Sequence, residues 1–362
     1  MTPADPAARR RSAAATLLAD DTTPLIRQAW YAVATSADVG RTPLAREVMD
    51  TSLVLYRREN GSVVVLQNRC SHRSFPLAHG TLEGDSLRCR YHGLRYDDTG
   101  RCVEVPLQAQ VPPLLCVRRY AALERGGFVW VWFGDAQRTD ESLLPAPDWL
   151  DSPDWDAYVG YLHLDGGYLH LHENLLDLSH LSYLHANTFG TPEYARAPVE
   201  LAIKGEDIQV WRHVTCELPA LYAVPLGWQG MQVLRSSGSR YVAPGLHVNT
   251  GILRKLEGPP DPQLPLPQVR VAQIITPETR ERTHYWYVVC RNFARGRPDI
   301  DDFMRHAQLA AFAEDQFAIE QITRLRRLDG VTGIGEAHIP TDAAGLAMRR
   351  HIKALVDREA VA

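Results

Sequence analysis

The chain is poor in cysteine and carries little net charge for its length. Its 362 residues contain six cysteines, and the formal net charge is −4. No apolar run approaches the roughly 20 residues that a helix needs to cross a bilayer. These features exclude a disulfide-rich secreted scaffold and a membrane-spanning protein. The small negative charge gives no reason to expect nucleic acid or an anionic membrane as a partner.

The remaining composition is that of an ordinary globular protein, with 45% apolar and 23% charged residues. A chain of this length is expected to form two domains. Residues 1–27 contain several arginines but no long apolar stretch behind them, so they do not form a secretory signal. We predict a mobile N-terminal extension over these residues and a cytoplasmic location for the protein.

Two close-spaced pairs of cysteine and histidine are the strongest signal in the sequence. One residue separates Cys70 from His72, and after sixteen further residues two residues separate Cys89 from His92. Structural zinc sites usually combine a cysteine pair with a histidine pair, so a zinc knuckle is the weaker alternative. Here each pair supplies one sulfur and one nitrogen. The pattern therefore suits a Rieske [2Fe–2S] centre, in which one iron takes both thiolates and the other takes both imidazoles.

The other four cysteines lie in apolar, strand-like segments. They are Cys102, Cys116, Cys216 and Cys290. We expect all four to be buried free thiols rather than disulfide partners or nucleophiles.

The sequence changes character along the chain in a way that indicates two domains. Over residues 28–134, short runs such as WYAVA and FVWVWFG alternate with Gly, Asn and Asp clusters, which predicts an antiparallel β domain. Residues 135–155 contain three prolines among acidic residues and are interpreted as a linker. Residues 156–362 form the second domain.

This second domain mixes strands and helices. It opens with strand-like text (YVGYLHLDGGYLHLH), turns helical at ENLLDLSHLSYLHANTFG, and returns to strands. A long helix is predicted over about residues 300–328, with a last helix from about residue 341.

A second metal site is indicated in the predicted helix after residue 172. Asn174, Asp177 and His180 are spaced by three and share a helical face, whereas His185 converges with His180 only if the helix is distorted or ends there. Two histidines and one carboxylate suit a non-haem Fe(II) centre that activates O₂. The sequence offers two candidates for the carboxylate ligand: Asp177, and the distant Asp315, which has Glu314 and Glu320 nearby.

Together the two motifs resemble those of the oxygenase (α) component of Rieske non-haem iron oxygenases. The resemblance covers nearly the whole chain. It is closest to the branch with vanillate O-demethylase, toluenesulfonate methyl-monooxygenase and dicamba O-demethylase. In that family the pattern Asn-x-x-Asp-x-x-His-x-x-x-x-His matches Asn174, Asp177, His180 and His185, and the third iron ligand corresponds to Asp315. The resemblance implies that Asp177 is no ligand but links the cluster of one subunit to the iron of its neighbour.

The resemblance also implies an architecture and partners. The expected fold is α+β, with an all-β Rieske domain followed by a helix-grip-like catalytic domain in which an antiparallel sheet wraps on helices. The family's subunits form rings of three. Electrons are expected from NAD(P)H through a separate flavin/ferredoxin-type reductase, because this chain has neither a nucleotide fingerprint nor the all-Cys spacing of a plant-type ferredoxin.

The implied function is oxidative demethylation or hydroxylation of an aromatic, acidic substrate with O₂. Ring cis-dihydroxylation is the rival within enzymes, and a Rieske electron-transfer protein is the rival from another class. Asn249, Gln273 and His306 are candidate substrate contacts, although each could be a satisfied core polar group. His170, His172 and His284 alternate with apolar residues in strand-like text and are expected to be structural.

Overall fold

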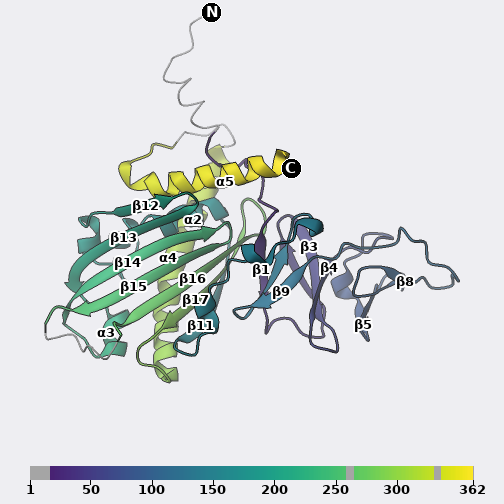
Figure 1. Cartoon of the computed structure of the whole chain (residues 1–362), viewed down its shortest axis with the longest axis horizontal. Coiled ribbons are helices and arrows are strands. Elements are labelled where there is room, and N and C mark those ends of the chain that lie inside the picture. Colours follow the sequence, from purple (N-terminus) through teal and green to yellow (C-terminus); the bar gives the residue numbers. More distant parts are fainter. Residues whose placement is uncertain (1–16, 258–264, 330–335, 362) are drawn as a thin grey trace, which may run out of the picture. The chain divides into compact units, whose positions relative to one another are not determined.

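A computed structural model describes residues 17–257, 265–329 and 336–361 (Figure 1). The chain separates into two compact units. The first spans Arg27–Asp151, and the second combines Met1–Ile26 with Ser152–Ala362. No helix in the described part of the chain is long and apolar enough to span a membrane.

The unit over Arg27–Asp151 consists of short antiparallel strands in three small sheets. The first sheet has the order β1 (Trp30–Thr35), β10 (Phe128–Trp132), β9 (Ala122–Arg125). The second has the order β2 (Leu44–Val48), β3 (Thr51–Arg57), β4 (Val63–Gln67). The third has the order β5 (Thr81–Glu83), β6 (Ser86–Arg88), β7 (Arg95–Tyr96), β8 (Cys102–Glu104).

Aromatic and β-branched residues explain why β10 is a central strand of this unit. Its sequence FVWVW is buried at every position, as expected for a strand covered on both faces. Short 3₁₀ turns complete the unit, namely η1 (Leu77–His79), η2 (Ala136–Arg138), η3 (Glu141–Leu143) and η4 (Asp148–Asp151). The all-β prediction for this part of the chain is confirmed.

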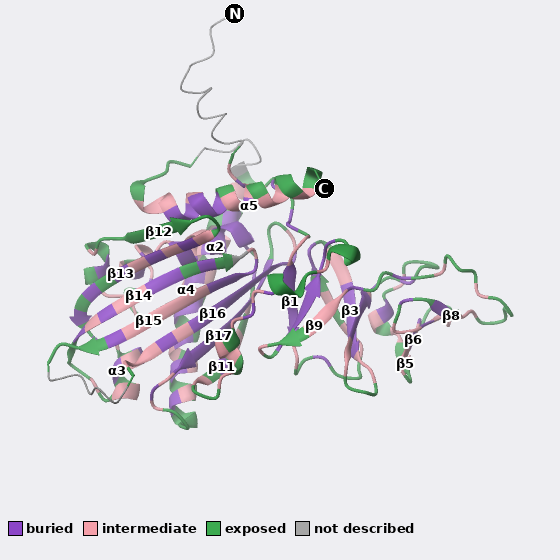
Figure 2. Cartoon of the chain, viewed as in Figure 1, coloured by how far each residue is buried: buried purple, intermediate pink, exposed green. Residues whose placement is uncertain are grey.

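The other unit is built on one seven-stranded antiparallel sheet. Its order is β11 (Asp156–Leu164), β17 (Thr283–Arg291), β16 (Gln268–Pro277), β15 (Leu246–Lys255), β14 (Gln232–Ala243), β13 (Asp207–Glu217), β12 (Glu200–Lys204). Burial changes across this sheet (Figure 2): β17 is buried at every residue, β13 alternates, and the edge strand β12 is exposed throughout. The exposed edge carries two charged residues, which discourages pairing with another chain.

Helices cover this sheet and complete the α+β fold (Figure 1). The helices are α2 (Tyr168–Leu176), α3 (Ala220–Leu226), α4 (Pro298–Asp329) and α5 (Ala343–Val361), with 3₁₀ turns η5 (His180–Ser182), η6 (Pro192–Ala195) and η7 (Pro340–Asp342). Helix α2 packs on β14 and β16 and against α4 and α5. The two C-terminal helices confirm the predictions made from periodicity.

The region before the second metal site differs from its prediction. The text YLHLH was assigned to a strand, but it lies in α2, which ends at Leu176 instead of continuing through residue 190. Most residues of α2 are buried, so apolar residues are not confined to one face of the helix. The spacing of apolar residues cannot distinguish such a segment from a strand. His170 and His172 are therefore helical residues and not strand residues.

The N-terminal prediction also needs correction. Residues 1–16 of the predicted mobile extension lie outside the described residues, but residues 17–26 pack on the larger unit. Ala19 is fully buried, and its N–H donates to the Arg349 carbonyl at 3.1 Å. Asp21 lies 3.3 Å from His170 and 2.5 Å from Arg326. Burial raises the pKa of Asp21, but the hydrogen bonds from His170 and Arg326 outweigh it and hold that pKa well below its usual range.

The cysteine prediction holds at three of four positions. Cys102, Cys216 and Cys290 are buried free thiols, whereas Cys116 is exposed. Cys116 joins the sheets only through an isolated bridge to Arg101, and the neighbouring Leu114 is itself 79% exposed. The segment is apolar in sequence but runs over the surface.

A buried histidine pair connects α2 to the sheet. His172 Nδ1 lies 2.6 Å from His247 Nε2, and His172 Nε2 lies 2.9 Å from the Pro244 carbonyl oxygen. The carbonyl can only accept, so His172 donates from Nε2 and accepts at Nδ1 from His247. Both rings are thereby neutral, and burial lowers the pKa of His172 to about 4 and that of His247 well below 6.5.

This pair predicts loss of stability in acid. The unfolded chain takes up protons on these histidines as the pH falls through 6.5, while the folded chain takes none on His172 until about pH 4. The free energy of unfolding should therefore fall, as the pH decreases across that window, by about 1.4 kcal/mol per pH unit for each histidine that is fully protonated in the unfolded chain. Hydrogen exchange of β15 amides, corrected for intrinsic exchange, measures this between pH 7.5 and 5.5. The variant His172→Gln should show a shallower pH dependence than the wild type, and an identical one would contradict the assignment.

Candidate functional site

The residues of the first motif lie at the tips of two loops with the same backbone closure. Cys70 N–H donates to the Phe75 carbonyl and Ser74 N–H returns to the Cys70 carbonyl. In the second loop Cys89 N–H donates to Leu94 and Gly93 N–H returns to Cys89. Ser74 and Gly93 occupy the matching position with φ of 58° and 77°. Both turns need left-handed backbone there, which glycine adopts without strain.

Burial separates the two cysteines of this motif from its two histidines. Cys70 and Cys89 are 3% and 1% exposed and belong to the apolar core of the unit, whereas His72 and His92 are exposed. The two imidazole rings lie with centroids 4.6 Å apart. Two thiolates buried side by side need a positive group between them, and a [2Fe–2S] cluster with its Cys-ligated iron inside and its His-ligated iron outside fits this arrangement.

The second motif converges because α2 ends at Leu176. The Asp177 carboxylate accepts the Ser179 N–H at 2.7 Å, and such an Asx turn competes with helical hydrogen bonding. His180 then lies in η5, and His185 follows in a loop closed by a Gly190 N–H bond to the His185 carbonyl. A Cβ on Gly190 would lie 1.7 Å from the Leu181 carbonyl oxygen, so this loop requires glycine.

His180, His185 and Asp315 form a group whose potential ligand atoms all lie within 4.8 Å of one another. Asp315 Oδ1 lies 3.6 Å from His180 Nε2 and 3.1 Å from His185 Nε2. His185 Nε2 is buried and has no hydrogen-bond partner among the described residues. Two imidazole nitrogens aimed at one buried carboxylate fit a metal ion placed between them.

The other ring nitrogens of these histidines are already occupied. His180 Nδ1 contacts the Asp177 carbonyl oxygen, and His185 Nδ1 lies 2.7 Å from Glu314 Oε2. Burial alone would lower the pKa of His185, but the carboxylates of Asp315 and Glu314 outweigh it and raise that pKa. At His180 burial prevails and lowers the pKa. The Nδ1 contacts leave the Nε2 atom of each ring directed at Asp315, as metal ligands require.

The structure assigns different surroundings to the remaining acidic and amide residues of the motif. Asn174 Nδ2 donates to Asp315 Oδ1 at 2.9 Å. Asp177 contacts His180 through its backbone carbonyl, and its carboxylate does not belong to the group of potential metal ligands. Glu320 accepts from Gln316 and from the Asp165 N–H. Asp315, and not Asp177, is thus the carboxylate that meets both histidines, while the orienting contact from Glu314 was not foreseen.

The three convergent residues open onto a cavity of about 90 Å³. Its walls are formed by α2, α3, η5 and the following loop, α4 and strands β14–β16. The lining residues are Asn174, Leu175, Leu178, His180, Leu181, His185, Phe189, Tyr222, Arg235, Ser237, Gly238, Asn249, Thr250, Gly251, Val269, Val271, Gln273, Gln308, Phe312 and Asp315.

Two of the three predicted substrate contacts line this cavity. Asn249 and Gln273 belong to its wall, but His306 is exposed and lies 2.6 Å from the Asp302 carbonyl through its Nδ1. His306 precedes Asp315 by nine residues, or about 180° around an ideal helix. Gln308 precedes it by seven, which returns to the same face, and Gln308 lines the cavity. Counting helical positions from Asp315 would have selected Gln308.

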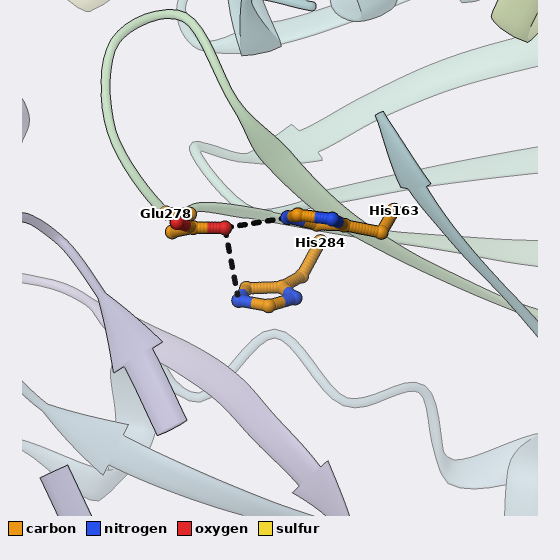
Figure 3. A group of neighbouring side chains, drawn as sticks. All are labelled: His163, Glu278 and His284. Atoms are coloured by element: carbon orange, nitrogen blue, oxygen red, sulfur yellow. Dashed lines mark hydrogen bonds and ion pairs between the residues drawn. The ribbon is translucent and has the colours of Figure 1, made fainter. Parts of the chain in front are cut away.

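A second group of histidines and a carboxylate is drawn in Figure 3, and none of its residues lines this cavity. His163 on β11 pairs across strands with His284 on β17, so the strand prediction for His284 is confirmed. Glu278 Oε2 lies 2.5 Å from His163 Nε2 and 4.0 Å from His284 Nε2, and its other oxygen accepts from Arg282 at 2.7 Å. Arg282 therefore supplies a positive charge beside the Glu278 carboxylate.

The sequence comparisons agree with this geometry. Residues 29–120 match the Rieske [2Fe-2S] domain, and residues 164–358 match the vanillate O-demethylase oxygenase C-terminal domain. The chain belongs to the Rieske non-haem iron oxygenases. It carries the Rieske domain and the non-haem iron domain of this family.

Individual relatives match over most of their length. The chain is 34% identical to the toluene-4-sulfonate monooxygenase system iron-sulfur subunit TsaM1 of Comamonas testosteroni, over 82% of this chain and 87% of that protein. It is 32% identical to the dicamba O-demethylase oxygenase component of Stenotrophomonas maltophilia, over 92% and 99%. A crystal structure of dicamba monooxygenase bound to 3,6-dichlorosalicylic acid superposes with a TM-score of 0.87 at 32% identity, covering 94% of this chain and 100% of that one.

The first motif leads to a prediction about the cluster. Changing Cys70 or His92 to Ala removes a predicted ligand, so the visible absorption and the reduced-state EPR signal of a Rieske centre should disappear. Iron bound by the larger unit should survive, because none of the four motif residues belongs to that unit. Cys102→Ala, which removes a buried thiol outside the motif, is the matched control and should keep the signal. Zinc without labile sulfide in the purified wild type would contradict the assignment.

Proposed function

We propose that this chain is the terminal oxygenase component of a Rieske monooxygenase system that oxidatively demethylates, or hydroxylates a methyl group of, an aromatic acid. The carrying observation is the cavity, whose largely apolar wall also contains His180, His185 and Asp315. Facial coordination by two histidines and one carboxylate leaves positions open for O₂. The relatives named for toluene-4-sulfonate, dicamba and vanillate support an aromatic acid as the substrate.

In this proposal Cys70, His72, Cys89 and His92 hold the [2Fe–2S] cluster, and His180, His185 and Asp315 hold iron. When bound, these centres supply electrons and O₂ activation. Net demethylation converts a methoxy compound, O₂, NAD(P)H and a proton to the hydroxy compound, formaldehyde, water and NAD(P)⁺.

The residues around the iron ligands act by orientation and by exclusion of water. Asn174 fixes the Asp315 carboxylate, and Glu314 fixes the His185 ring, so that the ligand atoms keep one geometry during turnover. Leu178, Leu181 and Phe312 form apolar parts of the wall that exclude water from the reacting substituent. Asn249, Gln273 and Gln308 can hydrogen-bond the substrate and fix its pose. The Tyr285 hydroxyl donates to Gln273 Oε1, so the Nε2 amino group of Gln273 is the part of the side chain that can donate to a ligand.

The proposal includes two kinds of partner. A separate NAD(P)H-dependent flavin/ferredoxin-type reductase supplies electrons, and the oxygenase assembles as a homotrimer. The exposed imidazoles of His72 and His92 can meet another copy of the chain. Asp177 offers a carboxylate beside His180, and we propose that it accepts a hydrogen bond from a cluster histidine of the neighbouring copy.

Two rivals predict different outcomes. A ring cis-dihydroxylase would use the same metal ligands and differ in the pocket, so its product distinguishes it. A Rieske electron-transfer protein without oxygen chemistry would need neither the cavity nor the second group of ligands. That group and the match to an oxygenase domain disfavour this rival.

The proposed role of Asp177 predicts separation of metal binding from turnover. Asp177→Asn removes the charge but keeps the shape, so both metals should remain while turnover falls by at least about 100-fold. Asp315→Ala should instead lose the mononuclear iron, because it removes a proposed ligand. Iron content and the rate of product formation measure the two effects. Equal loss of iron in both variants would show that Asp177 is a ligand.

The proposed reaction predicts its stoichiometry and its labelling. With a ferredoxin-type reductase, NADH and 4-methoxybenzoate, equal amounts of NADH and O₂ should be consumed per formaldehyde formed. With 4-toluenesulfonate the product should be the alcohol, and ¹⁸O₂ should place one labelled atom in it. A cis-dihydrodiol carrying both atoms of O₂ would overturn the monooxygenase assignment and leave the metal sites unchanged.

A further inference from the structure

Arg235 introduces a positive charge into the wall of the cavity without a carboxylate to balance it. It lies on β14 and is 3% exposed. Its Nη1 donates to the Phe189 carbonyl at 2.8 Å, and it forms no ion pair with any described residue. The buried Arg291 and Arg349 each have such a pair, with Asp301 and with Glu173 respectively. A buried cation that lacks a counter-charge is costly unless a ligand supplies one.

Three aromatic rings hold this guanidinium in place. Its Cζ lies 5.6 Å from the ring centre of Phe189 and 5.1 Å from those of Tyr194 and Tyr222. Cation–π contacts of this kind stabilise a desolvated charge through its faces. The Phe189 carbonyl and the Tyr222 side chain take up part of the donor capacity of Arg235. A guanidinium has five N–H donors in a planar fork, so the others can bind a bidentate acid group. Arg212, on the adjacent strand, also lacks an ion pair among the described residues, but it does not line the cavity.

Phe189 connects Arg235 to one of the proposed iron ligands. Phe189 stacks on His185 with ring centroids 4.7 Å apart, and the same Phe189 ring lies next to Arg235. Arg235 and His185 therefore contact the same side chain, and both line the cavity. The neighbouring strand contributes Gly251, where an added Cβ would meet only the Val269 carbonyl oxygen at 3.9 Å, so the floor of the cavity is open there.

We propose that Arg235 is the specificity-determining residue of this oxygenase: it binds the carboxylate or sulfonate of an aromatic acid, lays the ring over Gly251 and directs the opposite substituent toward His180, His185 and Asp315. This inference rests on the proposed function for the reaction, but the recognition of an acid by Arg235 is tested by binding alone. A neutral aromatic of the same shape leaves the guanidinium buried and unbalanced, and should bind weakly.

The test compares acids with their neutral amides on the anaerobic holoprotein by calorimetry. The probes are 4-methoxybenzoate with 4-methoxybenzamide, and 4-toluenesulfonate with 4-toluenesulfonamide. The wild type should bind each acid at least about 30-fold more tightly than its amide. Arg235→Met should abolish that preference, and Arg235→Lys should retain part of it because the charge remains without the planar fork. Arg254→Met, an exposed arginine on the adjacent strand β15, is the matched control and should keep the full preference.

A second variant tests the same idea without removing Arg235, whose loss could displace the loop that contains Phe189. Ser237 lies two residues along the same strand and also lines the cavity. Ser237→Asp supplies an internal counter-charge, so acid binding should be lost while amide binding remains. Iron content and cluster absorption confirm that each variant is loaded. The inference is overturned if the wild type does not prefer acids, or if loaded Arg235→Met and Ser237→Asp both keep the preference. Those outcomes contradict only the role of Arg235 and not the proposed oxygenase reaction. If the wild type prefers acids but shows no turnover, only the proposed reaction is contradicted.

Discussion

Asp315 brings a negative charge into the interior of the larger unit, and the elements around it are arranged to accommodate that charge. Its side chain is nearly buried, and Asn174, His180 and His185 all approach the same oxygen, Oδ1. An isolated carboxylate at this depth would be strongly unfavourable. The contacts connect the end of α2, the turn after it and the middle of α4, so the helix packing and the geometry of the site depend on each other.

The two metal centres follow opposite rules of burial, and each rule fits its task. In the Rieske domain the sulfur ligands are buried and the imidazoles are exposed. A centre that exchanges electrons with another protein needs such an accessible edge. In the larger unit His185 is almost fully buried, His180 is partly buried, and both line a cavity. A centre that activates O₂ must exclude water, so its ligands lie in the interior.

Candidate ligand residues could be proposed from the sequence because metal chemistry allows few residue types at narrow spacings. Cys70, His72, Cys89 and His92 needed only local sequence, and Asp315 needed a family pattern because no spacing connects it to His180. Residues of the cavity wall were harder. Gln308 can be found from its position relative to Asp315 on α4. Arg235 lies in an ordinary strand sequence (QVLRSSGS). It is recognised as a candidate binding residue only in the folded structure, where no carboxylate of the described residues pairs with it. The end of α2 was missed because the Asp177 side chain, rather than any Gly or Pro, terminates the helix.

The central claim is that one chain carries both a cluster of mixed sulfur and nitrogen ligation and a separate iron centre. Quantitative iron and labile-sulfide analysis of protein purified without oxygen, combined with ⁵⁷Fe Mössbauer spectroscopy, tests it most directly. The account predicts an iron to sulfide ratio of about 3:2, with one high-spin Fe(II) site distinct from the coupled pair. A ratio of about 1:1 with no isolated Fe(II) in freshly loaded protein, or zinc in place of iron at either centre, would contradict it.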